Sequence, residues 1–194
     1  QQLLRLDNES TKLVSENIIT EFKNNFKLYD LILVSDYAKG VVSSELMDFL
    51  RSTNIPIYVD PKPNNKYLFT NVACITPNMS EGIQMSGFTN SSDIVKQLSG
   101  ELQTTVLLTK SEDGMEYGNH DLSVHIKTST TNSDPVDVTG AGDSAIATFI
   151  YYIASGCSID ESIIKAQIAA QISIMHLGCY AVSEGEIEKY EKTK

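Results

Sequence analysis

The segment 137–143, DVTGAGD, has the residue types whose chemistry is easiest to interpret. Its two glycines and its alanine expose backbone N–H groups just before the apolar stretch 144–153, which we predict to be helical. Because those N–H groups and the positive end of the helix dipole converge, the turn is suited to bind phosphate. Asp143 would repel a resting phosphate, but it can accept a proton from an attacking hydroxyl. The segment therefore indicates phosphoryl transfer.

Three other interpretations of this segment fit it less well. Gly140-x-Gly142-x-x-Ala145 also fits the dinucleotide fingerprint, but that motif should follow the first strand of a βαβ unit, and here the polar loop 131–135 precedes it. The P-loop pattern Gly-x-x-x-x-Gly-Lys-Ser/Thr does not occur in the chain. A structural turn with a helix-capping acid explains one glycine and one aspartate, but not the whole block.

Asn78 and Glu81 form a second candidate pair, placed where a strand gives way to a helix. Residues three apart lie on one helix face, where their oxygens can hold Mg²⁺ through bridging water. The same pair can equally be a capping box, in which Asn begins the helix and Glu returns a hydrogen bond. Alone, the pair favours the capping box. Beside the phosphate-binding turn, we favour the magnesium interpretation.

Lysines follow two strand-ending acids, in Asp36-Tyr37-Ala38-Lys39-Gly40 and Asp60-Pro61-Lys62-Pro63. Such lysines can receive a substrate or nucleotide phosphate as point charges, although loop lysines are often simply solvated. The segment 109–114, TKSEDG, is either a strand-to-hairpin turn or a contact for the ribose or phosphates of a nucleotide.

Alternating strands and helices position these residues. Each predicted strand is followed by a polar residue, namely Asp36, Asp60, Asn78 and Lys110. We expect strands at 31–36, 55–60, 72–76 and 105–109, with helices at 43–51, 80–85 and 92–102. This order predicts a parallel sheet covered on both faces, with the four polar residues in one crevice at the carboxyl ends of the strands.

The remaining elements complete the fold class. Alternation from 115 to 127 around the turn 118–121 predicts an antiparallel hairpin at the sheet edge. Two helices are expected at 144–154 and 159–177, with Ser155-Gly156 between them. A last helix at 183–194 begins at a serine cap followed by Glu186.

The composition of the 194 residues is that of a globular protein, with 41% hydrophobic and 21% charged residues, and we expect a single domain over 1–194. The net charge of -10 argues against a general nucleic-acid surface. Three widely spaced cysteines, the absence of an apolar run of membrane-spanning length and the absence of a signal pattern predict a cytoplasmic protein. The opening residues QQLLRLD lack an initiator Met and suggest that a preceding portion is missing.

The block 137–143, with Asn78-x-x-Glu81 before it, resembles the signature motifs of the ribokinase-like (PfkB) carbohydrate kinases in both order and spacing. The resemblance covers the whole chain and implies an α/β/α sandwich with a mostly parallel sheet, ATP and Mg²⁺ as cofactors, and room for a monovalent cation. It implies Asp143 as catalytic base and the amides of Gly140, Ala141 and Gly142 as the anion hole. Implied nucleotide contacts are Asn78, Lys110, Glu112, Gly114, Thr139 and Gln167, the last standing where relatives often carry Asn.

Within the family, the segments 1–7, 35–40, 59–62 and 75–81 resemble the members that phosphorylate D-glycero-D-manno-heptose 7-phosphate at its anomeric hydroxyl to give heptose 1,7-bisphosphate. Those members supply ADP-heptose for the lipopolysaccharide core. Asp36, Lys39 and Lys62 are then candidates for the substrate or its phosphate, and Glu81 with Asn78 for the metal.

The chain also departs from the family pattern. The amino-terminal part that carries sugar-binding residues and a lid is absent from these residues, as is the His-x-x-x-His motif of a nucleotidyltransferase domain. We therefore expect nucleotide binding with little turnover from this chain alone, and a full-length protein that is homo-oligomeric and open to fusion with a nucleotidyltransferase. The alternatives are another sugar kinase, of the fructose or ribose class, and a non-catalytic nucleotide-binding module.

Overall fold

The computed structural model describes residues 4, 6, 8, 11–14, 16–121, 123–126 and 135–193. Most of the opening segment 1–7 and the polar loop 131–134, on which two sequence arguments depended, lie outside the described residues. The described strands form one sheet in the order β1 (Ile32–Ser35), β2 (Ile57–Asp60), β3 (Cys74–Ile75), β4 (Thr105–Thr109), β5 (Met115–Gly118) and β6 (Ser123–Ile126).

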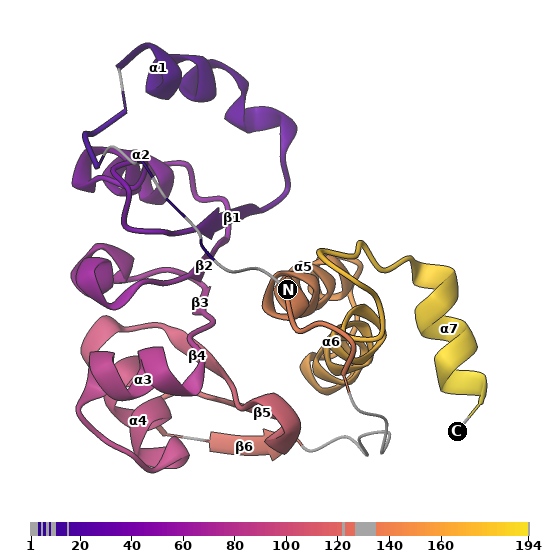
Figure 1. Cartoon of the computed structure of the whole chain (residues 1–194). Helices are drawn as coiled ribbons and strands as arrows, with labels where there is room; N and C mark the ends of the chain where they lie inside the picture. The colour runs from indigo at the N-terminus through magenta and orange to yellow at the C-terminus, as the bar shows by residue number, and fades with distance from the viewer. Residues whose placement is uncertain are drawn as a thin grey trace.

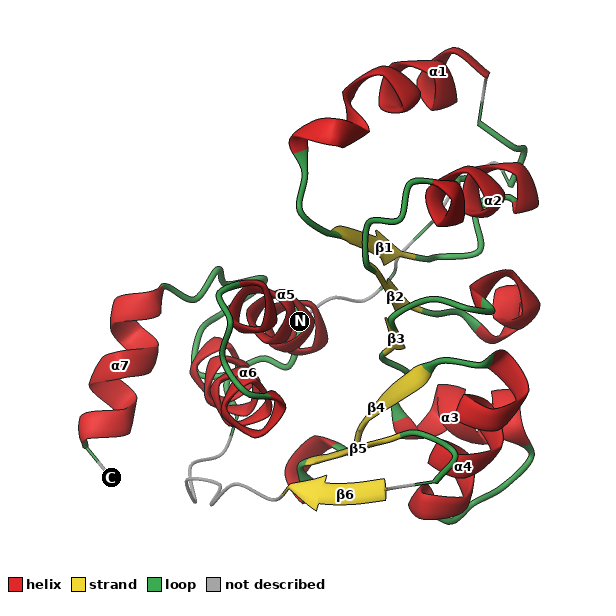
Figure 2. Cartoon of the chain, turned by 180° about the vertical axis from the view of Figure 1, so that it is seen from behind, coloured by secondary structure: helices red, strands yellow, loops and turns green. Residues whose placement is uncertain are grey.

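Helices cover both faces of this sheet, as Figures 1 and 2 show. On one face lie α2 (Ser44–Ser52), the 3-10 helix η2 (Pro63–Phe69), α3 (Met79–Ser86) and α4 (Ser91–Leu102). On the other lie α5 (Ala141–Ala154) and α6 (Ile159–Ser173), with α7 (Glu184–Lys192) outside them. The remaining elements are α1 (Glu16–Asn25), η1 (Phe26–Leu28) and η3 (Ser111–Asp113). The expected three-layer arrangement is confirmed.

The strand directions also match the expectation. β1 to β4 pair in parallel, with registers such as Val34 opposite Val59 and Ile75 opposite Val106. β5 pairs antiparallel with β4 and with β6, which makes the predicted edge hairpin. Because the first four strands run in one direction, their carboxyl ends meet along one edge of the sheet.

Side chains that alternate along a strand pack into two different hydrophobic cores, one on each face of the sheet. Val106 and Leu108 pack with residues of α2, α3 and α4, whereas Leu107, between them, packs with Phe149 of α5. Strands buried on both faces read as continuous apolar runs, which is why TVLLT at β4 is almost uninterrupted.

Several boundaries differ from the sequence-based expectation. The helix expected over 159–177 ends at Ser173, because the Ile174 carbonyl accepts N–H bonds from Val136 and Asp137, which draws the chain toward the phosphate turn. The strand expected from residue 55 begins at Ile57, since Pro56 has no N–H to donate. α5 begins three residues early, so that Gly142 and Asp143 belong to its first turn.

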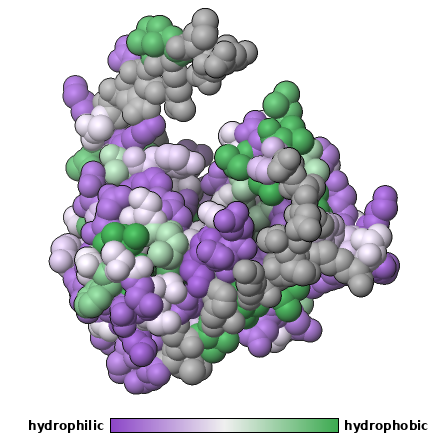
Figure 3. All heavy atoms as spheres, turned by 60° about the horizontal axis from the view of Figure 1, so that its bottom comes forward, coloured by the Kyte–Doolittle hydropathy of each residue, from purple (hydrophilic) through white to green (hydrophobic). Residues whose placement is uncertain are grey.

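The sequence analysis did not predict the helices α1 and η2. Among the described helices, none combines the length and apolar composition that a bilayer crossing needs. The face at the bottom of Figure 1, brought forward in Figure 3, is mostly hydrophilic, with hydrophobic residues in separate patches.

Candidate active site

A cleft of about 200 Å³ lies where the carboxyl ends of the central strands meet the start of α5. It brings together six of the candidate site residues from the sequence analysis, namely Asn78, Glu81, Lys62, Gly140, Gly142 and Asp143. The lining residues are Tyr37, Asp60, Lys62, Thr76, Asn78, Glu81, Thr109, Gly140, Gly142, Asp143 and Ile146. Two of the four strand-end residues expected in one crevice, Asp60 and Asn78, line this cleft together with Gly140 and Gly142 of the glycine turn, whereas Asp36 and Lys110 do not.

The turn before α5 depends on Gly140. This residue caps the helix with a left-handed φ of 78°, and a Cβ there would lie 3.3 Å from Cys179 Sγ. The following helix leaves its first N–H groups without intrahelical acceptors. Of the predicted anion-hole amides, that of Ala141 donates a long bond of 3.3 Å to the Val138 carbonyl. Gly142 and Asp143 follow in the first turn, and both line the cleft.

Asp137 ties this turn to the loop after α6. Its Oδ1 accepts a hydrogen bond from the Thr139 amide at 2.9 Å, and its Oδ2 accepts one from the Gly178 amide at 2.9 Å. Hydrogen bonds from Thr139 and the Gly178 backbone lower the pKa of Asp137. Thr139, a predicted nucleotide contact, thus helps to shape the turn.

Asn78 and Glu81 do form a capping box. The Asn78 side chain accepts from the Glu81 amide at 2.9 Å, and Glu81 Oε2 accepts from the Asn78 amide at 3.0 Å. Both residues nevertheless line the cleft. The other Glu81 oxygen, Oε1, holds the Lys62 ammonium at 2.5 Å. The carboxylate of Glu81 and the amide oxygen of Asn78 are hard oxygen donors of the kind that Mg²⁺ takes, and Oε1 already holds one cation, the Lys62 ammonium.

Asp60, one of the four strand-end residues expected in the crevice, lines the cleft, although the sequence analysis gave it no role of its own. Burial raises its pKa to about 6, with a further contribution from Glu81, while Lys62 opposes the shift and Asp143 adds to it. The pKa of Asp60 thus depends on two other carboxylates of the cleft. The available signal was its position, since an acid at the carboxyl end of a parallel strand faces this crevice.

Two lysines lie beside the ring of Tyr37, and one of them, Lys62, lines the cleft with it. The ammonium groups of Lys39 and Lys62 lie 5.8 and 5.9 Å from its ring centroid. Asp36, another predicted substrate residue, is only 1% exposed. Its oxygens accept hydrogen bonds from the Ala38 amide and the Asn65 side chain, so it organises the turn at 36–40 and does not line the cleft.

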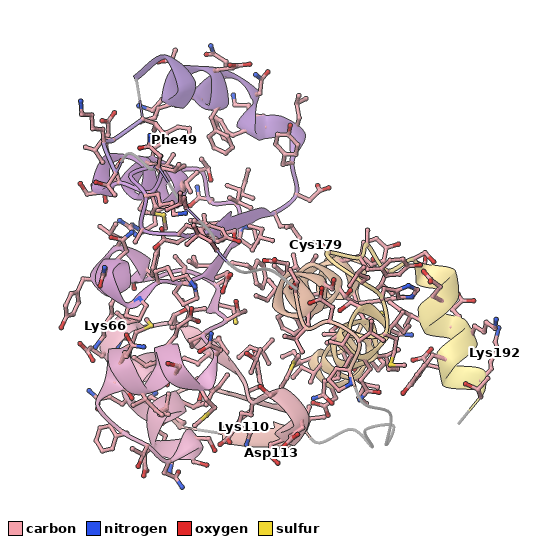
Figure 4. The ribbon with its side chains drawn as sticks, viewed as in Figure 1. Phe49, Lys66, Lys110, Asp113, Cys179 and Lys192 are labelled. Atoms are coloured by element: carbon pink, nitrogen blue, oxygen red, sulfur yellow. The ribbon has the colours of Figure 1, made fainter. Side chains whose placement is uncertain are left out.

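The other predicted nucleotide contacts lie outside the cleft. Lys110 was expected in the shared crevice, but its ammonium pairs with Glu116 at 3.0 Å, because Glu116 is almost fully buried and needs a counter-ion. Figure 4 places Lys110 toward the β5 and β6 end of the molecule, well apart from Cys179 beside the phosphate turn.

Glu112 is exposed in η3, and Gly114 ends that turn with a positive φ of 84°. Gln167 is 5% exposed and donates to the Ile126 carbonyl at 2.9 Å, which joins α6 to β6. In the described ranges, no group of three or more His, Cys, Asp or Glu side chains is arranged to hold a metal ion. The cleft therefore combines the carboxylate of Asp143, the glycines of the turn before α5, the carboxylate of Glu81 and the ammonium of Lys62.

Comparison with known proteins agrees with this geometry. The family described as pfkB family carbohydrate kinase matches residues 4–185. The bifunctional protein HldE of Campylobacter fetus is 35% identical over 206 residues, an alignment that covers 100% of this chain and 44% of that protein. The chain thus spans less than half the length of this curated relative.

Solved structures share the fold at low identity. Phosphofructokinase-2 from Escherichia coli, in complex with potassium, matches with a TM-score of 0.78 at 14% identity, covering 93% of this chain and 63% of that one. Ribokinase from Arabidopsis thaliana, complexed with ribose and ATP, matches with a TM-score of 0.73 at 17% identity, covering 92% and 59%.

Proposed function

The chain belongs to the pfkB family of carbohydrate kinases, and from that premise we propose that its cleft transfers the γ-phosphate of ATP to a sugar hydroxyl. The observation that carries the proposal is the position of Asp143, in the first turn of α5 and in the same cleft as Gly140 and Gly142. A base at the edge of a phosphate-binding turn can take the proton of the hydroxyl that attacks the phosphate held there.

The chemical step places each group in a role. The carboxylate of Asp143 accepts the proton of the sugar O–H while that oxygen forms a bond to the γ-phosphorus. The bond from phosphorus to the bridging oxygen breaks, and ADP leaves with the electron pair. The helix end and Lys62 stabilise the negative charge on the transferred group. Glu81 and Asn78 would hold Mg²⁺, which would supply further neutralisation of the nucleotide phosphates.

We propose heptose 7-phosphate as the sugar. The segments noted above resemble the heptose 7-phosphate kinases, and the word bifunctional in the name of the relative HldE fits a kinase joined to a nucleotidyltransferase. Lys62 in the cleft, and Lys39 beside the cleft residue Tyr37, favour a phosphorylated substrate over a free sugar, since each adds a positive charge on this side of the molecule.

The test is the substitution Asp143→Asn in the full-length protein. It removes the proton acceptor without changing the size of the side chain, so we expect turnover to fall by roughly a thousandfold or more while ATP binding persists. Undiminished turnover would contradict the role of Asp143.

A panel of substrates tests the sugar. Heptose 7-phosphate should be phosphorylated in preference to fructose, ribose and free heptose. Preference for a free sugar would favour the other sugar kinases. ATP binding without ATP consumption by the complete protein would favour a non-catalytic nucleotide-binding module.

A further inference from the structure

We propose that the ammonium group of Lys62 is a built-in counter-ion for Glu81, which a divalent cation must displace before it can bind there. This inference rests on the proposed function, because it concerns how the same cleft takes up its metal and nucleotide. It assigns Lys62 a positioning role in addition to its positive charge toward phosphate.

The two partners differ in their freedom to move. The Glu81 side chain is 9% exposed, and its Oε2 is held by the Asn78 amide in the cap of α3. Its carboxylate is therefore fixed by the start of a helix. Lys62 has a side chain that is 36% exposed, on the loop after β2. When the pair separates, Lys62 is the partner that moves.

A metal and the ammonium compete for one oxygen. Hard divalent cations bind carboxylate oxygens directly or through their water, and the Lys62 ammonium already contacts Glu81 Oε1 at 2.5 Å. A metal ion at Glu81 Oε1 and the Lys62 ammonium would lie next to the same oxygen, and they would repel each other strongly in a partly buried cleft. A metal that binds Glu81 Oε1, directly or through a coordinated water, needs the position that the ammonium holds, so Lys62 must leave.

The displaced ammonium stays in the same cleft. Lys62 shares its lining with Gly140 and Gly142, where we place the phosphate, and its ammonium lies 5.9 Å from the Tyr37 ring. A nucleotide that arrives with its metal offers phosphate oxygens to the released lysine. Free metal offers no such replacement partner. Metal and nucleotide should therefore bind cooperatively, with Lys62 as the coupling residue.

The experiment is a titration of the protein with Mn²⁺, a hard divalent probe, in the absence of nucleotide, followed by paramagnetic relaxation of water protons. Lys62→Met should bind Mn²⁺ about tenfold more tightly than the unsubstituted protein, because the competing cation is gone. Lys62→Gln should behave in the same way. Adding Glu81→Gln to Lys62→Met should remove the gain. A nonhydrolysable ATP analogue should tighten Mn²⁺ binding more in the unsubstituted protein than in Lys62→Met.

Lys165→Met is the matched control. Lys165 also pairs with a glutamate, Glu191 at 2.9 Å, and its ammonium also lies over a tyrosine ring, that of Tyr152, but on α6 and outside the cleft. Its Mn²⁺ affinity should equal that of the unsubstituted protein. Equal affinity for Mn²⁺ with and without Lys62, or a gain that survives Glu81→Gln, overturns the inference. Sugar phosphorylation is measured separately, so that its failure counts against the proposed function alone.

Discussion

The pKa of Asp60 depends on its burial and on the other charged side chains of the cleft. Burial and the neighbouring carboxylates of Glu81 and Asp143 raise its pKa to about 6. A folded-state pKa above the unfolded value means that the native protein holds this proton more tightly than the unfolded chain does. Its contribution to stability is therefore full below about pH 4 and is lost as the pH rises toward about 6.

We expect a carboxyl resonance of Asp60 to titrate near pH 6 in a carbon-detected NMR experiment. Glu81→Gln should move that midpoint downward, because it removes the largest coulombic cause of the shift. Asp60→Asn should abolish the corresponding loss of denaturant stability between about pH 4 and pH 6. A midpoint near 4 in the unsubstituted protein would show that the cleft is more hydrated than its geometry indicates.

The phosphate turn is an element whose shape depends on a single backbone conformation. Gly140→Ala places a Cβ at a left-handed φ of 78° and 3.3 Å from Cys179 Sγ, so the cost combines strain with a close contact. We expect a loss of roughly 1–3 kcal/mol in unfolding free energy and weaker ATP binding. Gly156→Ala is the control, since its φ is 85° and a Cβ there meets no atom within 4 Å.

Strain at Gly156 should lower stability without changing ATP affinity. Both properties are measured by urea denaturation and by calorimetric titration with ATP. If Gly140→Ala weakened ATP binding no more than Gly156→Ala does, the turn would not be the phosphate site.

The hairpin of β4 and β5 contains a buried ion pair, Lys110 with Glu116, and a hydrogen bond from Ser92 at the start of α4 reaches the same glutamate. Glu116 is 3% exposed and accepts from Lys110 at 3.0 Å and from the Ser92 hydroxyl at 2.6 Å. Glu116→Ala leaves the Lys110 charge poorly compensated, so we expect a loss of roughly 3–5 kcal/mol in urea unfolding.

The exposed pair of Lys192 and Glu188, 3.9 Å apart on α7, is the control for that substitution. Glu188→Ala should cost less than about 1 kcal/mol. Similar losses for the two variants would mean that the Lys110 pair is as well solvated as the surface pair.

Local patterns in the sequence predicted most elements, because caps and periodicity act over a few residues. Ser43 begins α2 and Asn78 begins α3 through side-chain hydrogen bonds to the residues that follow. Long-range contacts could not be read in this way. The end of α6 depends on Val136, and the orientation of Lys110 depends on Glu116 across the hairpin.

The site was predictable to a similar extent. The glycine turn and Asp143 are contiguous, so their proximity is fixed by the chain itself. The union of Asp60, Lys62 and Glu81 in one cleft arises from the parallel register of β2 and β3. A position at the end of a strand predicts that a residue lies near the cleft, but not that its side chain lines it. Lys110 follows a strand and yet does not line the cleft.

At the scale of the whole molecule, the sheet separates two hydrophobic cores, and we expect them to unfold together. One core lies under α2, α3 and α4, and the other under α5 and α6. Cys74 lies in the central strand β3 and is 2% exposed. Its burial raises the thiol pKa to about 12, so almost no reactive thiolate exists in the native state. Cys179, by contrast, is exposed.

Cys74 should therefore react with a thiol reagent only when the whole molecule opens. In a variant with Cys157→Ser and Cys179→Ser, we expect the labelling rate of Cys74 to rise with urea with the same dependence as global unfolding. A ligand that binds only the folded protein stabilises it by about 2.7 kcal/mol at a hundred times its Kd, so ATP with Mg²⁺ at that level should slow labelling roughly a hundredfold. Labelling that ignores both urea and nucleotide would mean that β3 opens locally, and that the two halves of the core do not unfold as one.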